Sequence, residues 1–380
     1  MQYRPIGKTG LNASIIGLGC EYFDVGNPPY QQIKATIDTA LDGGVNIFDI
    51  FMPGTAVREA ISKALGNRRK DIIIQGHIGS TDIRQQYDIS RDMPTVKKYF
   101  EDMLRVYGRI ELGMLFFIDT EEDYKNVFET GFADYAVKLK RDGDIGHIGF
   151  SSHNPVTAKR VIETGLVEML MFSINPAFDM LPSQEYVFDH VDKKFGRELF
   201  RGMDSVRASL YTLCEEREIG ITVMKAMGGG KLLSSEFTPF EIPLTLSQCL
   251  HYALTRPAVC SVLPGCKTSE EMQQALDYLN QADSEKDFAH VISTMREGFA
   301  GACVYCNHCQ PCPAGIDIAS VNKYLDMAKA ADIVPPSVKS HYANLKNRGD
   351  TCVACGHCSA RCPFGVDVVG KMQEAEQIFG

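Results

Sequence analysis

The sequence predicts an α/β protein in which a (β/α)8 barrel of the TIM type is followed by a small α-rich domain. Two observations carry this prediction. Short apolar segments alternate with amphipathic segments eight times over about the first 280 residues, and eight of the 13 cysteines fall in two short runs after residue 300. A doubly wound sheet is the competing fold, but no G-x-G-x-x-G motif follows the first apolar segment. We expect the barrel over residues 1–297 and the small domain over 298–380.

The expected strands are short apolar segments bounded by turn residues. They span residues 13–19, 45–51, 71–79, 111–119, 145–152, 168–175, 220–227 and 260–265. The expected helices have apolar residues at helical spacing, and they span residues 30–44, 56–66, 93–108, 123–143, 155–165, 205–220, 246–257 and 269–280. This strict alternation is the pattern of a barrel in which each parallel strand is followed by a helix.

Composition narrows the function classes. The chain has 39 basic and 48 acidic residues, a net charge of -9, which argues against a nucleic-acid-binding surface. No apolar run reaches the roughly 18 to 20 residues that span a bilayer, and the first ten residues lack the apolar core of a signal peptide. We therefore expect a cytoplasmic protein with no membrane partner. Because that compartment reduces disulfides, its many cysteines favour metal binding.

The two cysteine runs predict two 4Fe–4S clusters. The second run, "CVACGHCSARCP", has the C-x2-C-x2-C-x3-C-P spacing of bacterial two-cluster ferredoxins, and the first, "CVYCNHCQPCP", differs only in a shorter last spacing. In that arrangement the fourth cysteine of each run ligates the other cluster. We expect one cluster on Cys303, Cys306, Cys309 and Cys362, and the second on Cys352, Cys355, Cys358 and Cys312.

Two alternatives accompany this prediction. Structural zinc usually takes two C-x-x-C pairs about 12 to 20 residues apart, and four cysteines within ten residues fit that pattern badly. The shortened spacing before Cys312 leaves open whether this residue ligates the partner cluster or its own.

The first 300 residues resemble the aldo-keto reductase family. The resemblance rests on "YRPIGKTGLNASIIGLGC", "NIFDIF", "IGHIGFSSHNP", "GITVMKAMGGGKL" and "VLPGCKTSEEM", which occur in order and at matching strands. A branch of that family carries a C-terminal ferredoxin-like extension with two such cysteine runs, so the resemblance covers essentially the whole chain. It implies an oxidoreductase with an Asp–Tyr–Lys–His tetrad at the carboxyl ends of strands two to four.

Three of the four tetrad positions are changed. Asp49 matches the aspartate, but Gly54 stands at the tyrosine position, His77 at the lysine position and Phe116 at the histidine position. The usual proton donor is therefore missing. We expect Asp49 and His77 to form the replacement pair, because a neighbouring carboxylate stabilises an imidazolium near neutral pH. In the alternative, His77 only bonds a loop and Asp49 only supports the barrel.

Other polar residues follow the expected strands at the same end. Tyr22 is a candidate for the lost hydroxyl. Further candidates are Asp119, His153 and Asn154, with Asn175 after the sixth strand and Lys225 in the seventh. We treat Asn175 and Lys225 as candidate cofactor-binding residues.

Nicotinamide binding is the second cofactor question. The family's phosphate-binding loop implies Gly265, Lys267 and Thr268, although Thr268 with Glu271 also reads as a helix-capping box that needs no ligand. The family's contacts to the nicotinamide carboxamide imply Ser151 and Ser152. Only part of the family's usual contact set is present in this sequence. A flavin is the other candidate, because a hydride carries two electrons while each cluster takes one.

Three functions remain open at this point. The first is an iron–sulfur oxidoreductase of anaerobic character that passes electrons between the clusters and a small carbonyl or enone-type substrate, with a ferredoxin or flavoprotein as redox partner. The second is an altered barrel that serves as an electron-transfer or partner-docking protein. The third is an NAD(P)H-dependent aldo-keto reductase with a relocated acid.

Overall fold

The computed structural model describes residues 1–83, 88–185, 187, 202–293 and 299–380. The chain divides into two compact units, of which unit 1 contains residues 1–173, 219–226 and 259–280, and unit 2 contains residues 174–218, 227–258 and 281–380. The boundary expected at residues 297–298 falls within 294–298, outside the described residues, and stays a prediction.

Unit 1 is built on one eight-stranded parallel sheet in the order β12-β11-β10-β9-β8-β5-β4-β3. The sheet curls into a nearly closed barrel, since isolated bridges join Ile16 to Val262 and Gly19 to Gly265. Each expected strand segment overlaps one of these strands, which are β3 (Leu18–Gly19), β4 (Ile47–Ile50), β5 (Ile73–Ile78), β8 (Ile110–Leu115), β9 (Ile145–Ser152), β10 (Met169–Ser173), β11 (Gly220–Met224) and β12 (Val259–Val262). The predicted (β/α)8 pattern is confirmed for the barrel.

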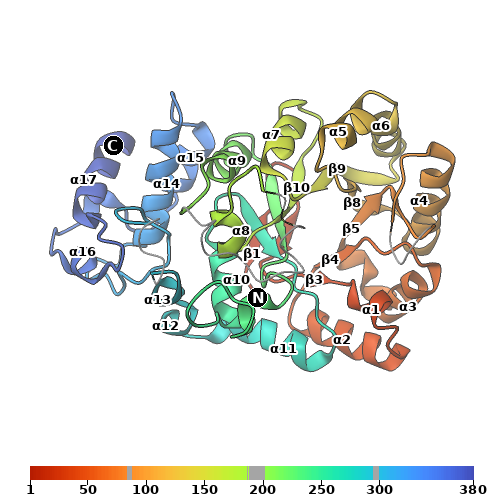
Figure 1. Cartoon of the computed structure of the whole chain (residues 1–380), viewed down its shortest axis with the longest axis horizontal. Helices are drawn as coiled ribbons and strands as arrows, with labels where there is room; N and C mark the ends of the chain where they lie inside the picture. Colours follow the sequence, from red (N-terminus) through yellow and green to blue (C-terminus); the bar gives the residue numbers. More distant parts are fainter. Residues whose placement is uncertain (84–87, 186, 188–201, 294–298) are drawn as a thin grey trace. The chain divides into compact units, whose positions relative to one another are not determined.

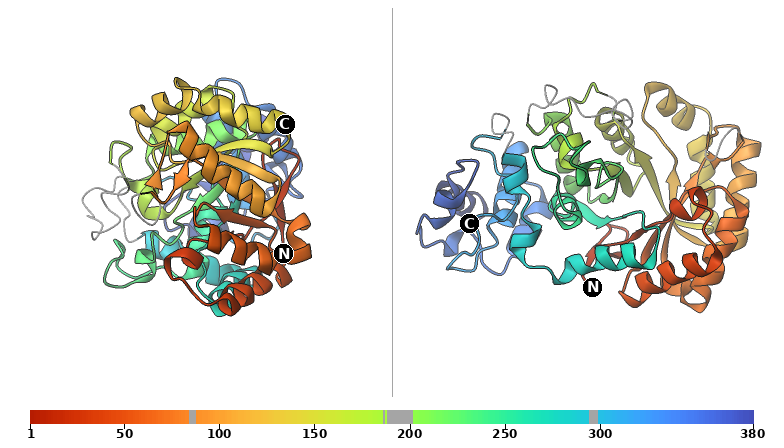
Figure 2. Two further views of the ribbon diagram at one scale, coloured as in Figure 1. Left: turned by 90° about the vertical axis from the view of Figure 1, so that its right-hand side faces the viewer. Right: turned by 60° about the horizontal axis from the view of Figure 1, so that its bottom comes forward.

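The helices of unit 1 follow the strands and lie outside the sheet (Figure 1). They are α1 (Tyr22–Val25), α2 (Tyr30–Asp42), α3 (Thr55–Leu65), α4 (Met93–Tyr107), α5 (Glu121–Phe128), α6 (Phe132–Asp142), α7 (Pro155–Glu163) and α11 (Ser269–Asp277), with 3-10 turns at Gly66–Asp71 and Tyr278–Asn280. Helix α11 packs beside α2, so the end of the barrel sequence lies next to its beginning (Figure 2).

The structure differs from the sequence prediction in three places. The helix expected over 123–143 is two helices, because Gly131 before α6 has a left-handed φ of 83° that a continuous helix cannot include. Two short antiparallel pairs were also not predicted, β1 (Tyr3–Pro5) with β2 (Asn12–Ser14), and β6 (Ser80–Thr81) with β7 (Asp88–Ile89).

The first hairpin covers the amino ends of the barrel strands. Its Ile6 and Ala13, with Leu11 packed beside them, join the apolar core formed by strand residues such as Leu112 and Met169. A core that is closed at this end leaves the carboxyl ends of the strands, which we call the mouth, as the place for polar chemistry.

Unit 2 is helical. Its elements are α8 (Pro176–Met180), α9 (Ser205–Glu216), α10 (Leu246–Leu254), α12 (Asp283–Lys286), α13 (Ala289–Ile292), α14 (Ile318–Ala330), α15 (Pro336–Ala343), α16 (His357–Arg361) and α17 (Val368–Phe379), with 3-10 turns at Lys231–Leu233 and Gly349–Thr351. Helix α14 packs against α17 and α15. No helix in the described ranges is long and apolar enough to cross a membrane.

Truncation of the barrel core tests this description. Leu112 is fully buried in β8, so Leu112→Ala should lower the free energy of unfolding by about 2–5 kcal/mol through lost burial and the cavity left behind. Val137→Ala on the exposed side of α6 is the control, with an expected change within about 0.5 kcal/mol. Denaturant titrations of both variants check the difference, and equal changes would contradict the placement of Leu112.

Candidate functional site

Two of the predicted catalytic residues meet at the mouth. Asp49 near the end of β4 and His77 near the end of β5 are only 3% and 2% exposed. The Nε2 atom of His77 lies 2.8 Å from Oδ1 of Asp49. The expected contact is therefore present, and the buried carboxylate fixes the orientation of the ring.

Asp49 is held by a second partner from inside the barrel. The amide nitrogen of Gln75 donates to the same Oδ1 at 2.7 Å, and the Thr222 hydroxyl donates to the amide oxygen of Gln75 at 2.9 Å. These residues come from β4, β5 and β11. Because a buried polar group is costly without partners, this chain of hydrogen bonds supports Asp49 as a fixed acceptor.

The other nitrogen of His77 has no such partner. Within the described residues Nδ1 is buried and makes no hydrogen bond. The ring stands edge-on to Phe51 and Phe116, with centroids 6.1 and 5.2 Å away. A buried acceptor without a partner costs about 1–3 kcal/mol, so Nδ1 of His77 is a candidate contact for a bound ligand, and the catalytic role of His77 stays a prediction.

The position of the missing tyrosine has room for a side chain. Gly54 precedes α3, and a Cβ added there would meet Asp24 and Val57 at ordinary contact distances of 3.4 and 3.5 Å. Tyr22, the predicted substitute for the lost hydroxyl, lies against the loop after β12, and its catalytic role stays a prediction. Its ring packs 3.1 Å from the Cβ position of Gly265 and lies under Nζ of Lys267 at 4.7 Å.

The predicted phosphate loop is occupied by contacts within the protein. The Thr268 hydroxyl caps α11 by accepting from the backbone N–H of Glu271 at 3.3 Å, and the backbone N–H of Lys267 donates to the Glu271 carboxylate at 2.7 Å. The Lys267 side chain lies over the Tyr22 ring. The loop therefore caps α11 as the capping box predicts, and nucleotide binding by this loop stays a prediction.

The predicted carboxamide contacts are also engaged. Ser151 Oγ accepts from the backbone N–H of Phe117 at 2.8 Å, and Ser152 Oγ donates to Asp119 at 3.1 Å. Asn175 lies in unit 2, where its side chain caps α8 by accepting from the backbone N–H of Phe178 at 2.9 Å. Each hydroxyl or amide therefore has a structural use, and their cofactor roles stay predictions.

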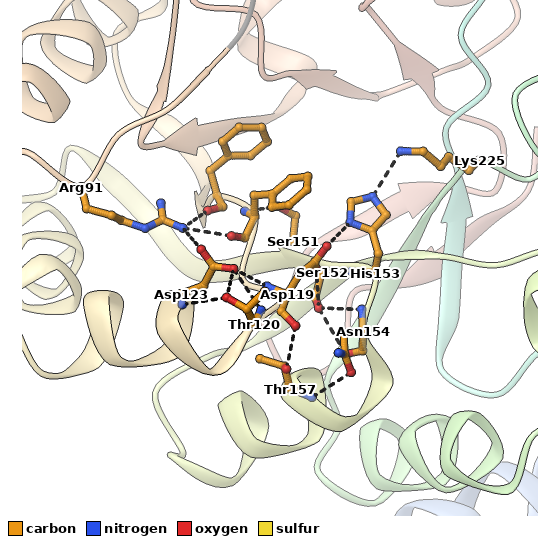
Figure 3. Close-up of polar contacts among 12 residues, drawn as sticks. Arg91, Asp119, Thr120, Asp123, Ser151, Ser152, His153, Asn154, Thr157 and Lys225 are labelled. Carbon is orange, nitrogen blue, oxygen red and sulfur yellow. Dashed lines mark hydrogen bonds and ion pairs between the residues drawn. The ribbon is translucent and has the colours of Figure 1, made fainter. Parts of the chain in front are cut away.

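A second charged group joins three strands at the mouth. Asp119 follows β8, His153 follows β9 and Lys225 follows β11. Figure 3 shows the chain of contacts, in which Oδ2 of Asp119 lies 3.0 Å from Nδ1 of His153, and Nε2 of His153 lies 3.2 Å from Nζ of Lys225. With the carboxylate accepting from Nδ1–H, the second ring nitrogen faces the lysine. This Asp–His pairing orients the imidazole as in catalytic triads, here toward an amine.

Together, burial and neighbouring charges lower the pKa values of both Asp119 and Lys225. Burial alone would raise the pKa of Asp119, but the charge and hydrogen bonds of His153 outweigh it and lower the pKa. Burial lowers the pKa of Lys225, against the opposing effect of Glu21, Asp119 and Asp49. Lys225 is thus easier to deprotonate than an exposed lysine.

The backbone is in the left-handed conformation at Lys225 and near Asp119. Lys225 has a left-handed φ of 58°, and Phe117, two residues before Asp119, has the same value. Arg91 donates to the carbonyls of Phe116 and Phe117 at 2.8 and 2.9 Å (Figure 3). Non-glycine residues in this conformation are strained by about 1–3 kcal/mol and occur mainly where function requires them.

The cysteine runs form two cavities within unit 2. The first is lined by Cys303, Cys306, Cys309 and Cys362. The second is lined by Cys312, Cys352, Cys355 and Cys358. Each cavity thus takes three cysteines from one run and the fourth from the other, and Cys312 lines the partner cavity despite its shortened spacing.

The two runs repeat the same local conformation. Tyr305 and Asn307 have left-handed φ values of 60° and 63°, and the equivalent Ala354 and Gly356 have 51° and 75°. These turns wind the backbone around each cavity. Three of the four residues are not glycine, so strain is again accepted at a candidate site.

The repeat continues beyond the cysteines as C-P-x-G-x-D. Gly315 and Gly365 both have a φ of 66°. The following aspartates, Asp317 and Asp367, cap α14 and α17 by accepting backbone N–H bonds at 3.1 and 3.0 Å. The shared turn directs each fourth cysteine toward the cavity of the other run.

Each cavity is lined by four cysteines, the number of ligands that a 4Fe–4S cluster takes. In the described residues no three Cys, His, Asp or Glu side chains converge tightly enough to hold one metal ion. A single zinc needs all its sulfurs within about 2.3 Å of one point, whereas a cubane binds each cysteine through a different iron. Four cysteines spread over the wall of an apolar cavity match the second geometry.

Comparisons with known proteins support the barrel fold. No protein-family model matches the chain. Aldo-keto reductase AKR11C1 from Bacillus halodurans, in its holo form, superposes with a TM-score of 0.58 and 19% identity over 75% of this chain and 94% of its own. A Pseudomonas aeruginosa protein described as an aldo-keto reductase superposes with a TM-score of 0.54 and 19% identity over 73% and 96%.

A curated protein is similar in sequence to this chain. The uncharacterized oxidoreductase YqkF from Bacillus subtilis is 23% identical over 309 residues, which cover 74% of this chain and 92% of that protein. The barrel has the fold of the aldo-keto reductases, and the names of these relatives support an oxidoreductase enzyme.

Sequence reasoning named Asp119, His153 and Lys225 separately but did not group them. They are far apart in the chain, and only their shared position at strand ends signalled a meeting at the mouth. Arg256 and Arg361, which contact the first cysteine run, were missed altogether, because their motifs look like ordinary helix ends.

The lowered pKa of Lys225 gives a direct test. At a given pH a larger fraction of its amine is neutral, so reductive methylation should label Lys225 at lower pH than the exposed Lys98. Asp119→Asn removes an anion that raises the pKa, so this variant should be labelled at still lower pH. Mass spectrometry of the labelled peptides over a pH series measures both shifts. An unchanged profile in Asp119→Asn would contradict the coupling.

Proposed function

We propose that this chain is an iron–sulfur oxidoreductase built on an aldo-keto-reductase-like barrel. Its C-terminal ferredoxin-like segment would bind two 4Fe–4S clusters, and its barrel mouth would bind a small carbonyl or enone-type substrate. The single observation that carries the proposal is the pair of cavities with crossed four-cysteine linings. Such clusters suit a reducing, cytoplasmic and anaerobic setting.

The mouth lacks the usual acid but supplies two other proton sources. When bound, each cluster supplies or accepts one electron at a time. Reduction of a carbonyl to an alcohol also consumes two protons. Lys225 is partly exposed and holds a proton at Nζ, while His77, when protonated, holds one at Nδ1.

The remaining residues hold these donors in place. Asp119 orients His153 so that Nε2 faces the Lys225 amine. Asp49 orients His77 through its Nε2. General acid catalysis by a positioned side chain contributes about 10²–10⁴-fold to a rate. Gly54 and Phe116, which stand at the tyrosine and histidine positions of the tetrad, cannot supply this acid catalysis.

A nicotinamide-dependent reductase with a relocated acid is the second candidate. The likeness of the barrel to aldo-keto reductases favours it. In that case Lys225, His153 and Asp119 would replace the missing tyrosine.

In the first candidate, the iron–sulfur oxidoreductase, electrons would come from a ferredoxin or flavoprotein. A barrel that only transfers electrons or docks a partner is the outcome if no substrate is turned over.

Iron and sulfide counting tests the cluster proposal. After anaerobic purification we expect about eight irons and eight sulfides per chain. Cys312→Ser and Cys362→Ser each remove one lining cysteine from a different cavity, so each should lose up to half of the iron. Cys214→Ser in α9 is the control, because that cysteine is buried away from both cavities. Iron-free wild-type protein would overturn the proposal.

Substitution of the two proton sources tests the mouth. We expect Lys225→Met and His77→Ala each to lower kcat for dithionite- or ferredoxin-driven reduction of enones and carbonyls, by about 10²–10⁴-fold. Lys98→Met on the exposed face of α4 is the matched control. Full activity of either mouth variant removes that residue from the mechanism.

A further inference from the structure

Arg256 is a buried cation in unit 2. Its side chain is 2% exposed and follows α10. One guanidinium nitrogen donates to the backbone carbonyl of Val304 at 2.5 Å and to Thr255 Oγ1 at 3.0 Å. The guanidinium carbon also lies 4.4 Å from the ring centroid of Tyr252 and 5.0 Å from that of Tyr305. The charge is therefore packed among neutral groups.

No carboxylate of the described residues forms an ion pair with Arg256, and its Nε makes no hydrogen bond there. The carboxylate that acts on it through charge is Asp179. That carboxylate already lies 3.5 Å from Arg207 and accepts from Tyr211 and Tyr252 at 2.6 and 2.9 Å. Asp179 is therefore already engaged by other side chains. Because an uncompensated buried charge costs several kcal/mol, a further anion is expected.

The position of Arg256 indicates which anion this is. Val304 and Tyr305, its contacts, stand between Cys303 and Cys306 and line the first cavity. The carboxylates that act through charge on these two cysteines each have a partner. Asp326 pairs with Lys371 at 2.6 Å, and Asp287 pairs with His308. Arg256 is a further buried cation in contact with residues that line this cavity.

Arg361 holds the corresponding place at the second cavity. It lines that cavity, where it is the permanently charged side chain among the described lining residues. Its Nη2 donates to the carbonyls of Cys309 and Pro311 at 2.8 and 2.9 Å, while its buried Nε has no partner within the described chain. This arginine therefore ties the first run to the wall of the second cavity.

We propose that Arg256 and Arg361 are the counter-charges of the two clusters, and that they raise the clusters' reduction potentials. The inference rests on the proposed function. A cubane with four thiolate ligands is an anion, and reduction adds a further negative charge. A fixed cation beside it stabilises the reduced form more than the oxidised form, most strongly where solvent is excluded. The more deeply buried Arg256 should have the larger effect.

Redox titration followed by electron paramagnetic resonance tests this inference without any substrate. In Arg256→Met the reduction equilibrium of one cluster should fall by about tenfold or more, which is about 59 mV for one electron. Arg361→Met should lower the potential of the other cluster. Arg256→Lys keeps the charge and should stay closer to wild type. Arg348→Met, whose arginine is exposed and paired with Asp350, is the control and should change neither potential.

A second measurement covers the apoprotein. Without the cluster Arg256 is uncompensated, so cluster-free Arg256→Met should be at least as stable to denaturant as cluster-free wild type. Unchanged potentials in loaded Arg256→Met and Arg361→Met overturn the inference and leave the proposed function standing. If Arg256→Met does not fold, Arg256→Lys and Arg361→Met decide. Iron-free wild-type protein overturns the proposed function, and this inference with it.

Discussion

The balance of buried charge is the constraint on which the polar parts of this protein depend. Asp49 is matched to His77, and Asp119 to His153 with Lys225 beyond it. In the helical unit, Asp179 is matched to Arg207 and two tyrosines. Where the balance is satisfied by the chain, the residues hold a fixed geometry. Arg256 differs, because within the described residues it is buried without an ion pair, and the proposed cluster would supply the missing negative charge.

The barrel could be predicted because its signal is repeated along the chain. Each of the eight apolar segments overlaps a strand, and helices follow at the expected places. Features that depend on one or two residues were not predicted. The hairpin of β1 and β2 is only three residues per strand, and the break between α5 and α6 depends on the backbone of Gly131. Segments of only a few residues are too short to show a periodic pattern of apolar residues in the sequence.

The candidate sites divide in the same way. The contact of Asp49 with His77, and the sharing of cysteines between runs, followed from strand position and motif spacing. The internal uses of Ser151 and Ser152 did not, because a hydroxyl's partner depends on which loop passes beside it. The grouping of Lys225 with His153 needed the three-dimensional register of neighbouring strands. The burial of Arg256 could not be predicted either, because arginines are normally exposed and its burial depends on how the helices pack.

The exchange of the fourth cysteine makes the two halves of the C-terminal segment mutually dependent. Neither run contains a complete set of four, because Cys312 lines the cavity of the later run and Cys362 that of the earlier one. A fragment that ended between the two runs would hold three cysteines of one set and a single cysteine of the other. Under the proposed function, insertion of either cluster would therefore need cysteines from both runs and could not be completed on the earlier run before the later one has been synthesised.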